Sequence, residues 1–334
     1  MNTKEQLATL LEQSGSEYLS GERLATQLGL TRAAIWKNIG LLTADGYEIE
    51  SSRQGYRLGP NSDALSENSI RMYLGDLNSA LELEVLSETD STNSYLRNIA
   101  ISAQHNGTLP ALRPWHVVVA SSQTAGRGRM GRTFVSPAGT GIYLSVLLRP
   151  SFDTNLAVRM TTAAAVAACQ AIEACTDERP QIKWVNDIFY HGKTVVGILT
   201  EASMSMENGN LEYAVPGIGF HVYSPEGGFP EELKDIAGAI LPERVPDAKN
   251  RIAAEFLNHF FAIYRSKDHG DYAAEYKKRS LVLGKNVDVI PTGGGKTRRA
   301  KVLDITEDCG LLVKFPDGTT EVLSSGEVSV RPEK

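Results

Sequence analysis

The sequence predicts a multidomain α+β protein built from three successive parts. Its 334 residues exceed the usual size of a single domain. A polar connector that contains proline, residues 59–63, follows a helical N-terminal segment, and strand and helix patterns alternate after it. Beyond residue 281 only strand patterns and turns remain. We therefore expect domains at residues 1–60, 65–280 and 281–334.

Composition narrows the class of protein. Apolar residues make up 42% of the chain and charged residues 22%, as in ordinary globular proteins. The net charge of −6 argues against a chain coated in nucleic acid but allows a local basic patch. Three cysteines without metal-ligand spacing argue against a disulfide scaffold or a structural zinc site. No signal-peptide pattern opens the chain, and the apolar run 160–174 is too short and too polar to span a bilayer, so we expect a cytoplasmic protein without membrane contact.

Apolar spacing in residues 1–60 predicts three short helices followed by a hairpin. Thr31 is a good N-cap for the third helix, and Ile35, Ile39 and Leu42 fall on one of its faces. Residues 46–59 alternate around a glycine-containing turn, as the two strands of a wing do. This order of elements predicts a winged helix-turn-helix domain.

The outward face of the third helix suits DNA. No acidic residue occurs between positions 31 and 43, and cationic and hydrogen-bonding side chains can reach phosphates or guanine edges in the major groove. The candidate DNA-binding residues are Arg32, Ala33, Trp36 and Lys37 on the helix and Arg53 on the wing. So few phosphate contacts bind weakly, so DNA binding implies a dimer. The alternative is a protein–protein contact module in which Trp36 is a contact residue.

The patterns of the middle part predict a mixed domain of strands and helices, and those of the last part predict a small β-barrel. Strand patterns cover residues 84–88, 115–121, 142–148, 195–202 and 211–219, and helix patterns cover 66–75, 92–103, 155–175 and 247–278. After residue 281, five short strand patterns with turn signals between them predict a barrel of SH3 type.

The segment 126–132, GRGRMGR, holds three glycines and three arginines. It fits G-x-G-x-x-G formally, but polar residues separate it from the preceding strand and a strand pattern follows it, which excludes a dinucleotide-binding fold. Glycines allow the backbone to approach a ligand closely, and the arginines repel one another unless an anion lies among them. We expect a loop that orders around a polyphosphate or an adenylate; the alternative is a basic surface turn. A second glycine run, 293–297, lacks the spacing of a P-loop and reads as a hairpin turn.

Two further segments, 183–187 (KWVND) and 192–199 (GKTVVGIL), are strand-like and adjacent. We expect a hairpin between them to bring Asp187 and Lys193 together at the opening of one site. Alone, such a pair is usually an exposed ion pair of small value. Beside the arginine loop, the pair instead indicates a cation at a phosphate position and a carboxylate that orients an incoming amine.

Taken together, these segments resemble the bifunctional biotin–protein ligases that also act as biotin operon repressors. The resemblance covers essentially the full length and is carried by DSTN at 90–93, Gln123, GRGRMGR, KWVND, GKTVVGIL, GIGFHV at 217–222 and the terminal GEVSVR. It implies a winged helix-turn-helix, a class II synthetase-like ligase core and an SH3-like C-terminal domain. The implied reaction forms biotinyl-5′-AMP from biotin and ATP and passes biotin to a lysine of a biotin carboxyl carrier protein.

The resemblance also implies site residues, ligands and partners. Those expected at biotin or its adenylate are Ser91, Thr92, Asn93, Gln123, Arg127, Gly128, Arg129 and Lys193; those associated with ATP are Arg132, Asn186 and His221; Lys193, Arg129 and Asp187 are the catalytic candidates. ATP and Mg²⁺ are the implied co-substrate and ion, with metal ligands unassigned, biotin is substrate and co-repressor, and no prosthetic group is expected. The implied partners are the carrier protein, operator DNA and a second copy of the chain when loaded with biotinyl-AMP.

Two positions depart from the family pattern. Met130 stands where arginine is usual, from which we expect altered affinity rather than lost activity. His221 stands where the family has asparagine, and only a neutral histidine offers both a donor and an acceptor. Two alternatives therefore stay open: a biotin-sensing regulator with impaired catalysis, and a lipoate-type ligase.

Overall fold

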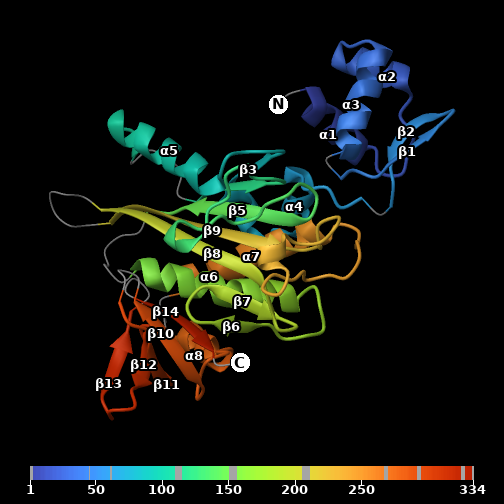
Figure 1. Cartoon of the computed structure of the whole chain (residues 1–334). Helices are drawn as coiled ribbons and strands as arrows, with labels where there is room; N and C mark the ends of the chain where they lie inside the picture. Colours follow the sequence, from blue (N-terminus) through green and yellow to red (C-terminus); the bar gives the residue numbers. More distant parts are fainter. Residues whose placement is uncertain are drawn as a thin grey trace.

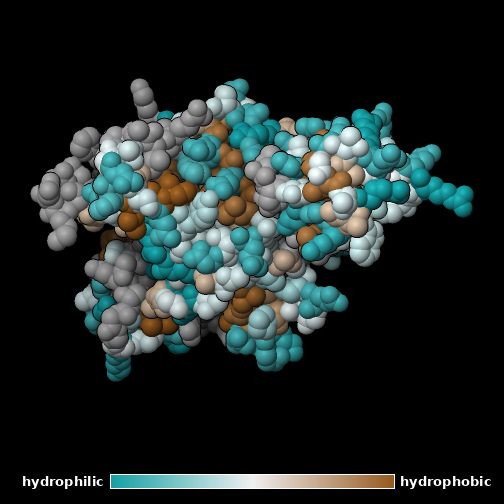
Figure 2. Space-filling model, turned by 90° about the horizontal axis from the view of Figure 1, so that it is seen from above, coloured by the Kyte–Doolittle hydropathy of each residue, from teal (hydrophilic) through white to brown (hydrophobic). Residues whose placement is uncertain are grey.

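The computed structural model describes residues 3–44, 46–60, 62–109, 115–149, 156–204, 211–266, 270–291, 295–324 and 328–332. Figure 1 shows a central sheet with helices on both faces, an N-terminal helical part at one end and a C-terminal sheet at the other. Across these residues no helix combines the length and apolarity needed to cross a membrane. Hydrophilic residues cover most of the face seen in Figure 2, and hydrophobic residues lie in separate patches.

The N-terminal part has the predicted order of elements: α1 (Thr3–Gln13), α2 (Gly21–Leu28), α3 (Arg32–Ala44), β1 (Ile49–Ser52) and β2 (Gly55–Leu58). The cap of α3 is confirmed, because Thr31 Oγ1 accepts a hydrogen bond of 3.2 Å from the Ala34 amide. Ile35, Ile39 and Leu42 are buried in a separate small core with leucines of α1 and α2. The strands β1 and β2 pair antiparallel as a two-stranded wing.

A seven-stranded mixed sheet forms the middle of the molecule, in the order β3-β4-β5-β9-β8-β7-β6. The strands are β3 (Glu82–Leu86), β4 (His116–Ala120), β5 (Gly141–Leu147), β6 (Gln181–Lys183), β7 (Asp187–Tyr190), β8 (Lys193–Met204) and β9 (Leu211–His221). Only β3 and β4 pair in parallel among these described strands. Each predicted core strand is present, and the hairpin β7–β8 joins the segments 183–187 and 192–199.

Helices cover both faces of this sheet (Figure 1). They are α4 (Glu67–Tyr73), α5 (Thr92–His105), α6 (Leu156–Glu173), α7 (Ala248–Arg265) and α8 (Gly270–Lys278), with short 3-10 turns at Asp76–Ser79, Arg129–Gly131 and Glu231–Leu233. The apolar side of α5 packs on one face, and α6 and α7 pack together in the large core on the other. One predicted helix, 247–278, is instead two helices, because α7 ends at Arg265 and Ser266 adopts an extended conformation.

The C-terminal part is a five-stranded antiparallel sheet in the order β13-β12-β11-β10-β14. The strands are β10 (Asn286–Pro291), β11 (Arg298–Ile305), β12 (Leu311–Lys314), β13 (Thr320–Leu323) and β14 (Val328–Pro332). In the described residues β13 and β14 are the edges and do not pair, so a closed barrel is not confirmed. The predicted glycine turn lies largely outside the described residues, since 292–294 are not placed.

Two junctions tie the parts together. The C-terminal sheet shares its apolar core with the central domain, and the Trp184 indole N–H donates to the Cys309 carbonyl at 2.9 Å. On the N-terminal side, Asp63 of the connector is buried and accepts from the Tyr223 hydroxyl at 2.5 Å and from the Lys249 amide at 2.8 Å. A buried carboxylate with two donors holds the connector on the central domain.

Candidate ligand-binding site

A cavity of about 280 Å³ opens in the central domain. Its walls come from the N-terminus of α5, the loop 123–135, the segment 183–187, and strands β5, β8 and β9. Ile290 of the C-terminal sheet also lines it. Eleven sequence-predicted site residues and the variant position Met130 lie in its wall or at its rim; the eleven are Ser91, Thr92, Asn93, Gln123, Arg127, Gly128, Arg129, Arg132, Asn186, Asp187 and His221.

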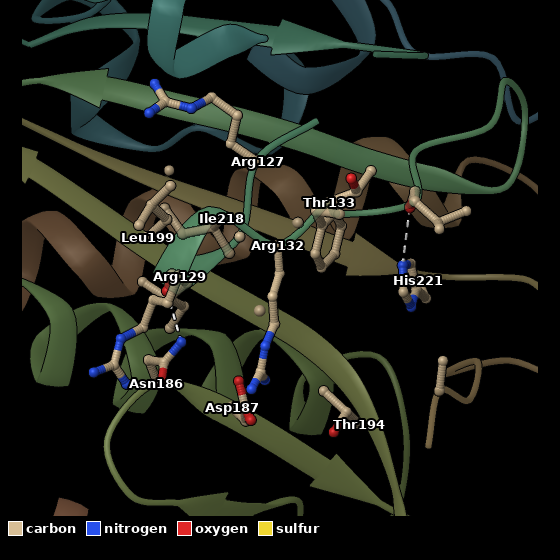
Figure 3. Close-up of a pocket in the computed structure, with 18 of the residues that line it drawn as sticks. Arg127, Arg129, Arg132, Thr133, Asn186, Asp187, Thr194, Leu199, Ile218 and His221 are labelled. Carbon is tan, nitrogen blue, oxygen red and sulfur yellow. Dashed lines mark hydrogen bonds between the residues drawn. The ribbon is translucent and has the colours of Figure 1, made fainter. Parts of the chain in front are cut away.

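The arginines of the loop point in different directions (Figure 3). The Arg127 side chain points away from those of Arg129 and Arg132, and its Nη1 lies 2.9 Å from Oε1 of Glu201 on β8. Arg129 is partly buried and donates from Nη1 to Asn186 Oδ1 at 2.9 Å. Figure 3 shows Arg132 extending toward Asp187. The loop therefore presents two guanidinium groups to the same wall of the cavity.

The charge of that wall is mainly positive. Four cationic side chains line the cavity, namely Arg127, Arg129, Arg132 and Lys183, of which Arg127 is already paired with Glu201. Among the described lining residues Asp187 is the one carboxylate. Burial lowers the pKa of Arg129, and the nearby Asp187 charge partly counters this effect. Lys183 lies 3.5 Å from Asp187. A cavity with this charge favours an anionic ligand.

The predicted pairing of Asp187 with Lys193 is wrong. In the hairpin Asp187 lies opposite Gly197, whereas Lys193 lies opposite Tyr190 beside the turn. The two residues are thus at opposite ends of β7, which is about 10 Å long at ~3.3 Å per residue. Lys193 is exposed, does not belong to the cavity wall, and donates to the Lys234 carbonyl at 2.9 Å. Lys183 takes its place beside Asp187.

Another wall is neutral and hydrogen-bonding. Gln123 Oε1 accepts from the Thr92 amide at 2.9 Å, and Gln123 Nε2 donates to Ser136 Oγ at 2.9 Å. Asn93 Nδ2 donates to the Leu199 carbonyl at 3.1 Å and to the Glu201 carboxylate at 3.0 Å. Asn93 lines the cavity, but its amide nitrogen already donates to two groups of the protein.

Glycines of β8 and β9 make room for this arrangement. A Cβ at Gly197 or Gly219 would collide with the ring of Phe134, which lies across both strands. A Cβ at Gly217 would collide with the amide of Asn93. Phe134 and Asn93, which cover these glycines, both line the cavity. Glycine at position 197 of GKTVVGIL and at positions 217 and 219 of GIGFHV is therefore needed for the packing of the cavity wall.

His221 is a neutral aromatic wall residue. It is 6% exposed, stacks on Phe134 with ring centroids 4.8 Å apart, and contacts Phe229. Burial lowers its pKa to about 4, although a hydrogen bond to Val135 acts in the opposite direction. His221 Nε2 lies 3.2 Å from the Val135 carbonyl oxygen, a contact drawn as a dashed line in Figure 3. Because a carbonyl only accepts, Nε2 carries the proton of the neutral ring. Nδ1 is then a buried acceptor without a hydrogen-bond partner among the described residues.

The DNA-binding candidates lie together on the N-terminal part. Arg32, Ala33, Trp36 and Lys37 are exposed along one face of α3, and Trp36 is 71% exposed. Arg53 is exposed at the turn of the wing. The α3 face is thus uncovered and carries two cations.

Sequence reasoning missed three residues around the cavity. Lys183 lay within a quoted motif, and its spacing of four from Asp187 was the available signal. Glu201 pairs with Arg127, and an acidic residue in an apolar strand pattern could have indicated this partner. Ser145 bonds to the Ser-Thr-Asn run from β5, and no local signal indicates that contact. The described residues hold no group of three or more His, Cys, Asp or Glu side chains placed to bind a metal.

Known families match all three parts of the chain. Residues 86–220 match the Biotin/lipoate A/B protein ligase family, residues 3–57 match an HTH domain, and residues 282–331 match the Biotin protein ligase C terminal domain. Fold and cavity together define a protein ligase of the biotin/lipoate class that carries an N-terminal helix-turn-helix domain.

Full-length relatives narrow this class. The chain is 34% identical to the bifunctional ligase/repressor BirA of Bacillus spizizenii, over 96% of this chain and 97% of that protein. It is 29% identical to BirA of Escherichia coli, over 95% of this chain and 94% of that protein. The chain therefore belongs to the family of bifunctional biotin–protein ligase/repressors.

A solved structure agrees with this assignment. The biotin protein ligase of Aquifex aeolicus in complex with biotin and ATP matches with a TM-score of 0.60 and 25% identity, over 75% of this chain and 99% of that chain. The predicted family resemblance is confirmed.

Proposed function

We propose that this protein joins biotin to ATP, transfers biotin to a lysine of a biotin carboxyl carrier protein, and represses transcription from an operator in response to biotin. The observation that best supports this function is a cavity with one neutral, hydrogen-bonding wall and one cationic wall. The chain that contains it matches bifunctional ligase/repressors over its whole length. The matching ligase family and the ligands of the Aquifex ligase support biotin and ATP as the substrates.

The first half-reaction brings two anions together. The biotin carboxylate attacks the α-phosphorus of ATP, the new C–O–P anhydride forms, and pyrophosphate leaves. Biotin supplies the nucleophile, so the protein needs no serine or cysteine for this step. Its task is to hold both anions and to stabilise the charge that develops on the phosphate, and we assign this role to Arg129, Arg132 and Lys183, which line the cavity.

The second half-reaction forms an amide. The ε-amine of the carrier lysine attacks the carbonyl carbon of biotinyl-AMP, AMP leaves, and the amine loses a proton. Asp187 is the carboxylate among the described cavity residues, and we assign it the orientation of the incoming amine. Lys193, which we expected at the adenylate, faces Lys234 in this conformation, and its assignment depends on a rearrangement of that contact.

Mg²⁺ enters this proposal with ATP. One carboxylate, Asp187, lines the cavity in the described residues, which fits an ion held mostly by nucleotide phosphates and water. When bound, the ion neutralises phosphate charge. We also propose a class II synthetase-like core, an SH3-like C-terminal domain, and domains at residues 1–60, 65–280 and 281–334. The cytoplasm is the compartment in which ATP, carrier and operator occur together.

Repression in response to biotin requires that ligand binding, dimerisation and DNA binding be thermodynamically linked. The exposed face of α3 offers cations to DNA, and a dimer doubles the phosphate contacts of one copy. If biotinyl-AMP binds the dimer better than the monomer, it shifts the population toward the form that binds a two-half-site operator.

A direct test uses the purified full chain, ATP, Mg²⁺, labelled biotin and a biotin carboxyl carrier protein. We expect label in the carrier together with pyrophosphate release. Operator binding without either product would instead identify a regulator that has lost catalysis. A parallel reaction with labelled lipoate and a lipoyl carrier tests the lipoate alternative, which the biotin-specific C-terminal match disfavours.

A further inference from the structure

Ser145 is a fully buried hydroxyl in an otherwise apolar strand. It lies in the middle of β5, opposite Val118 of β4 and Gly217 of β9, and is 0% exposed. It does not line the cavity. A buried hydroxyl destabilises the fold unless it is hydrogen-bonded, so its partners decide its role.

Both partners of Ser145 belong to the neutral wall of the cavity. Ser145 Oγ lies 2.7 Å from Thr92 Oγ1 and 2.6 Å from Asn93 Oδ1. One hydroxyl has one proton and cannot donate to both oxygens. The orientation of the Asn93 amide is fixed because its nitrogen faces acceptors, the Leu199 carbonyl and the Glu201 carboxylate. Asn93 Oδ1 therefore only accepts, and it receives the proton of Ser145.

This assignment fixes the proton of Thr92. At 2.7 Å, two hydroxyl oxygens need a proton between them, and the proton of Ser145 is already used. The Thr92 hydroxyl must therefore donate to Ser145 Oγ. Gln123 Oε1, 3.2 Å from Thr92 Oγ1, is a second and more distant acceptor for this hydroxyl, and it also accepts from the Thr92 amide at 2.9 Å. Thr92 Oγ1 is left with lone pairs only, and Thr92 lines the cavity.

We propose that Ser145 is a positioning residue for substrate recognition: it holds the Thr92 hydroxyl as a fixed acceptor for an N–H of the biotin ureido ring. The inference rests on the proposed function, because that function supplies the ligand. The hydrogen bonds run in one direction, from ligand N–H to Thr92, Ser145 and Asn93 and then to the Leu199 carbonyl and the Glu201 carboxylate. Without Ser145 the Thr92 hydroxyl can turn and is no longer aligned in advance for that N–H.

The test is a double-mutant cycle of Ser145→Ala and Thr92→Val in the full-length protein. The biotin Kd is measured by titration calorimetry, and the KM values for biotin and ATP and kcat are measured by pyrophosphate release. We expect Ser145→Ala to weaken biotin binding roughly three- to tenfold, the size of one ordinary hydrogen bond, and to leave kcat and the KM for ATP within about twofold. In the Thr92→Val background the same substitution should weaken biotin binding by less than about twofold.

Each other result overturns the inference. An undiminished effect of Ser145→Ala in the Thr92→Val background means that Ser145 does not act through Thr92. An equal rise in the KM for ATP means general damage to the domain. The matched control is Thr162→Val on α6, which removes another fully buried hydroxyl, one that bonds to its own helix, and should leave the biotin Kd unchanged.

A second variant and the wild-type protein distinguish a folding defect from a failure of the proposed function. If Ser145→Ala does not fold, Ser145→Cys fills the site with a somewhat larger thiol that is a much weaker hydrogen-bonding group, and it should give the same selective loss of biotin affinity. A normal Kd in that variant overturns the proposal. If the wild-type protein itself neither binds biotin nor releases pyrophosphate, the proposed function fails; if the wild type is active and Ser145→Ala binds biotin normally, only the role of Ser145 fails.

Discussion

Lowering the pH should destabilise the central domain through one buried side chain, His221. Its pKa is lowered to about 4 in the folded protein from an ordinary value of 6.5, chiefly by burial. Below pH 6.5 the unfolded chain binds a proton at this position, and the folded chain does not until the pH approaches 4. Stability is therefore lost as the pH falls through this window. At ~1.36 kcal/mol per pKa unit the full loss is about 3 kcal/mol, of which about 2 kcal/mol falls between pH 7 and pH 5.

The measurement needs a reporter for the central domain alone. The chain has three tryptophans, and Trp36 lies exposed on α3, so Trp36→Phe leaves the fluorescence of Trp115 and Trp184 to report on that domain. In this background, urea unfolding at pH 7 and pH 5 is compared with and without His221→Asn. We expect the protein with His221 to lose about 2 kcal/mol more over this pH range than the asparagine variant.

The comparison removes the contributions of other groups. Asp63, for example, has a pKa raised by burial, which acts in the opposite direction with pH, but it is present in both proteins. The exposed His105 provides the control, since His105→Asn should follow the parent protein at both pH values. Equal losses with His221 and with asparagine between pH 7 and pH 5 would refute the reasoning about a neutral buried imidazole.

Three further predictions concern the loop, the helix and the connector. Arg129→Ala removes a guanidinium that lines the cavity and, at ~1.5–3 kcal/mol for one charge-assisted hydrogen bond to the bound adenylate, should raise the release of biotinyl-AMP at least about tenfold, measured by biotin labelling of bystander lysines. Arg32→Ala combined with Lys37→Ala should lower the salt slope of duplex DNA binding by about 2 in anisotropy titrations, at ~0.9 per phosphate contact, and leave ligation intact. Tyr223→Phe leaves the buried Asp63 carboxylate without one donor and should cost about 1–3 kcal/mol in urea unfolding.

Matched variants make these outcomes decisive. Lys301→Ala with Lys314→Ala removes two exposed cations from the C-terminal sheet and should leave the DNA salt slope unchanged. Arg298→Ala removes a surface guanidinium paired with Glu321 and should not release adenylate. Adenylate retention unchanged in Arg129→Ala would exclude that arginine from the site, and a salt slope unchanged in the α3 variant would exclude α3 as the recognition helix.

Local signals were enough where the structure is local. Thr31 caps α3, and the spacing of Ile35, Ile39 and Leu42 gives its buried face, because helix contacts repeat every three to four residues. The break after Arg265 was missed because the helical pattern continues on both sides of it. The SH3-like closure of the last five strands stays a prediction.

Local sequence patterns do not predict contacts between residues on different strands and helices. The sequence places Asp187 and Lys193 within one hairpin, but only the register shows that they lie at opposite ends of β7. Ser145 lies 53 positions from Thr92, and hydroxyls in strand patterns are too common to nominate one. The family resemblance supplied the residues of the cavity, whereas the contacts among them required the fold.

The cavity itself restricts the ligand more closely than any one residue does. Thr92 offers a fixed acceptor, Gln123 and Asn93 already satisfy protein groups, and this wall therefore suits a neutral ligand group that can donate N–H. The cations at Arg129 and Lys183 need negative charge on the same ligand or beside it. A fatty acid would leave Thr92 without a donor, and a nucleotide alone would leave the neutral wall unused. A ureido ring joined through a carboxyl group to a phosphate satisfies both walls at once, and biotinyl-AMP has that composition.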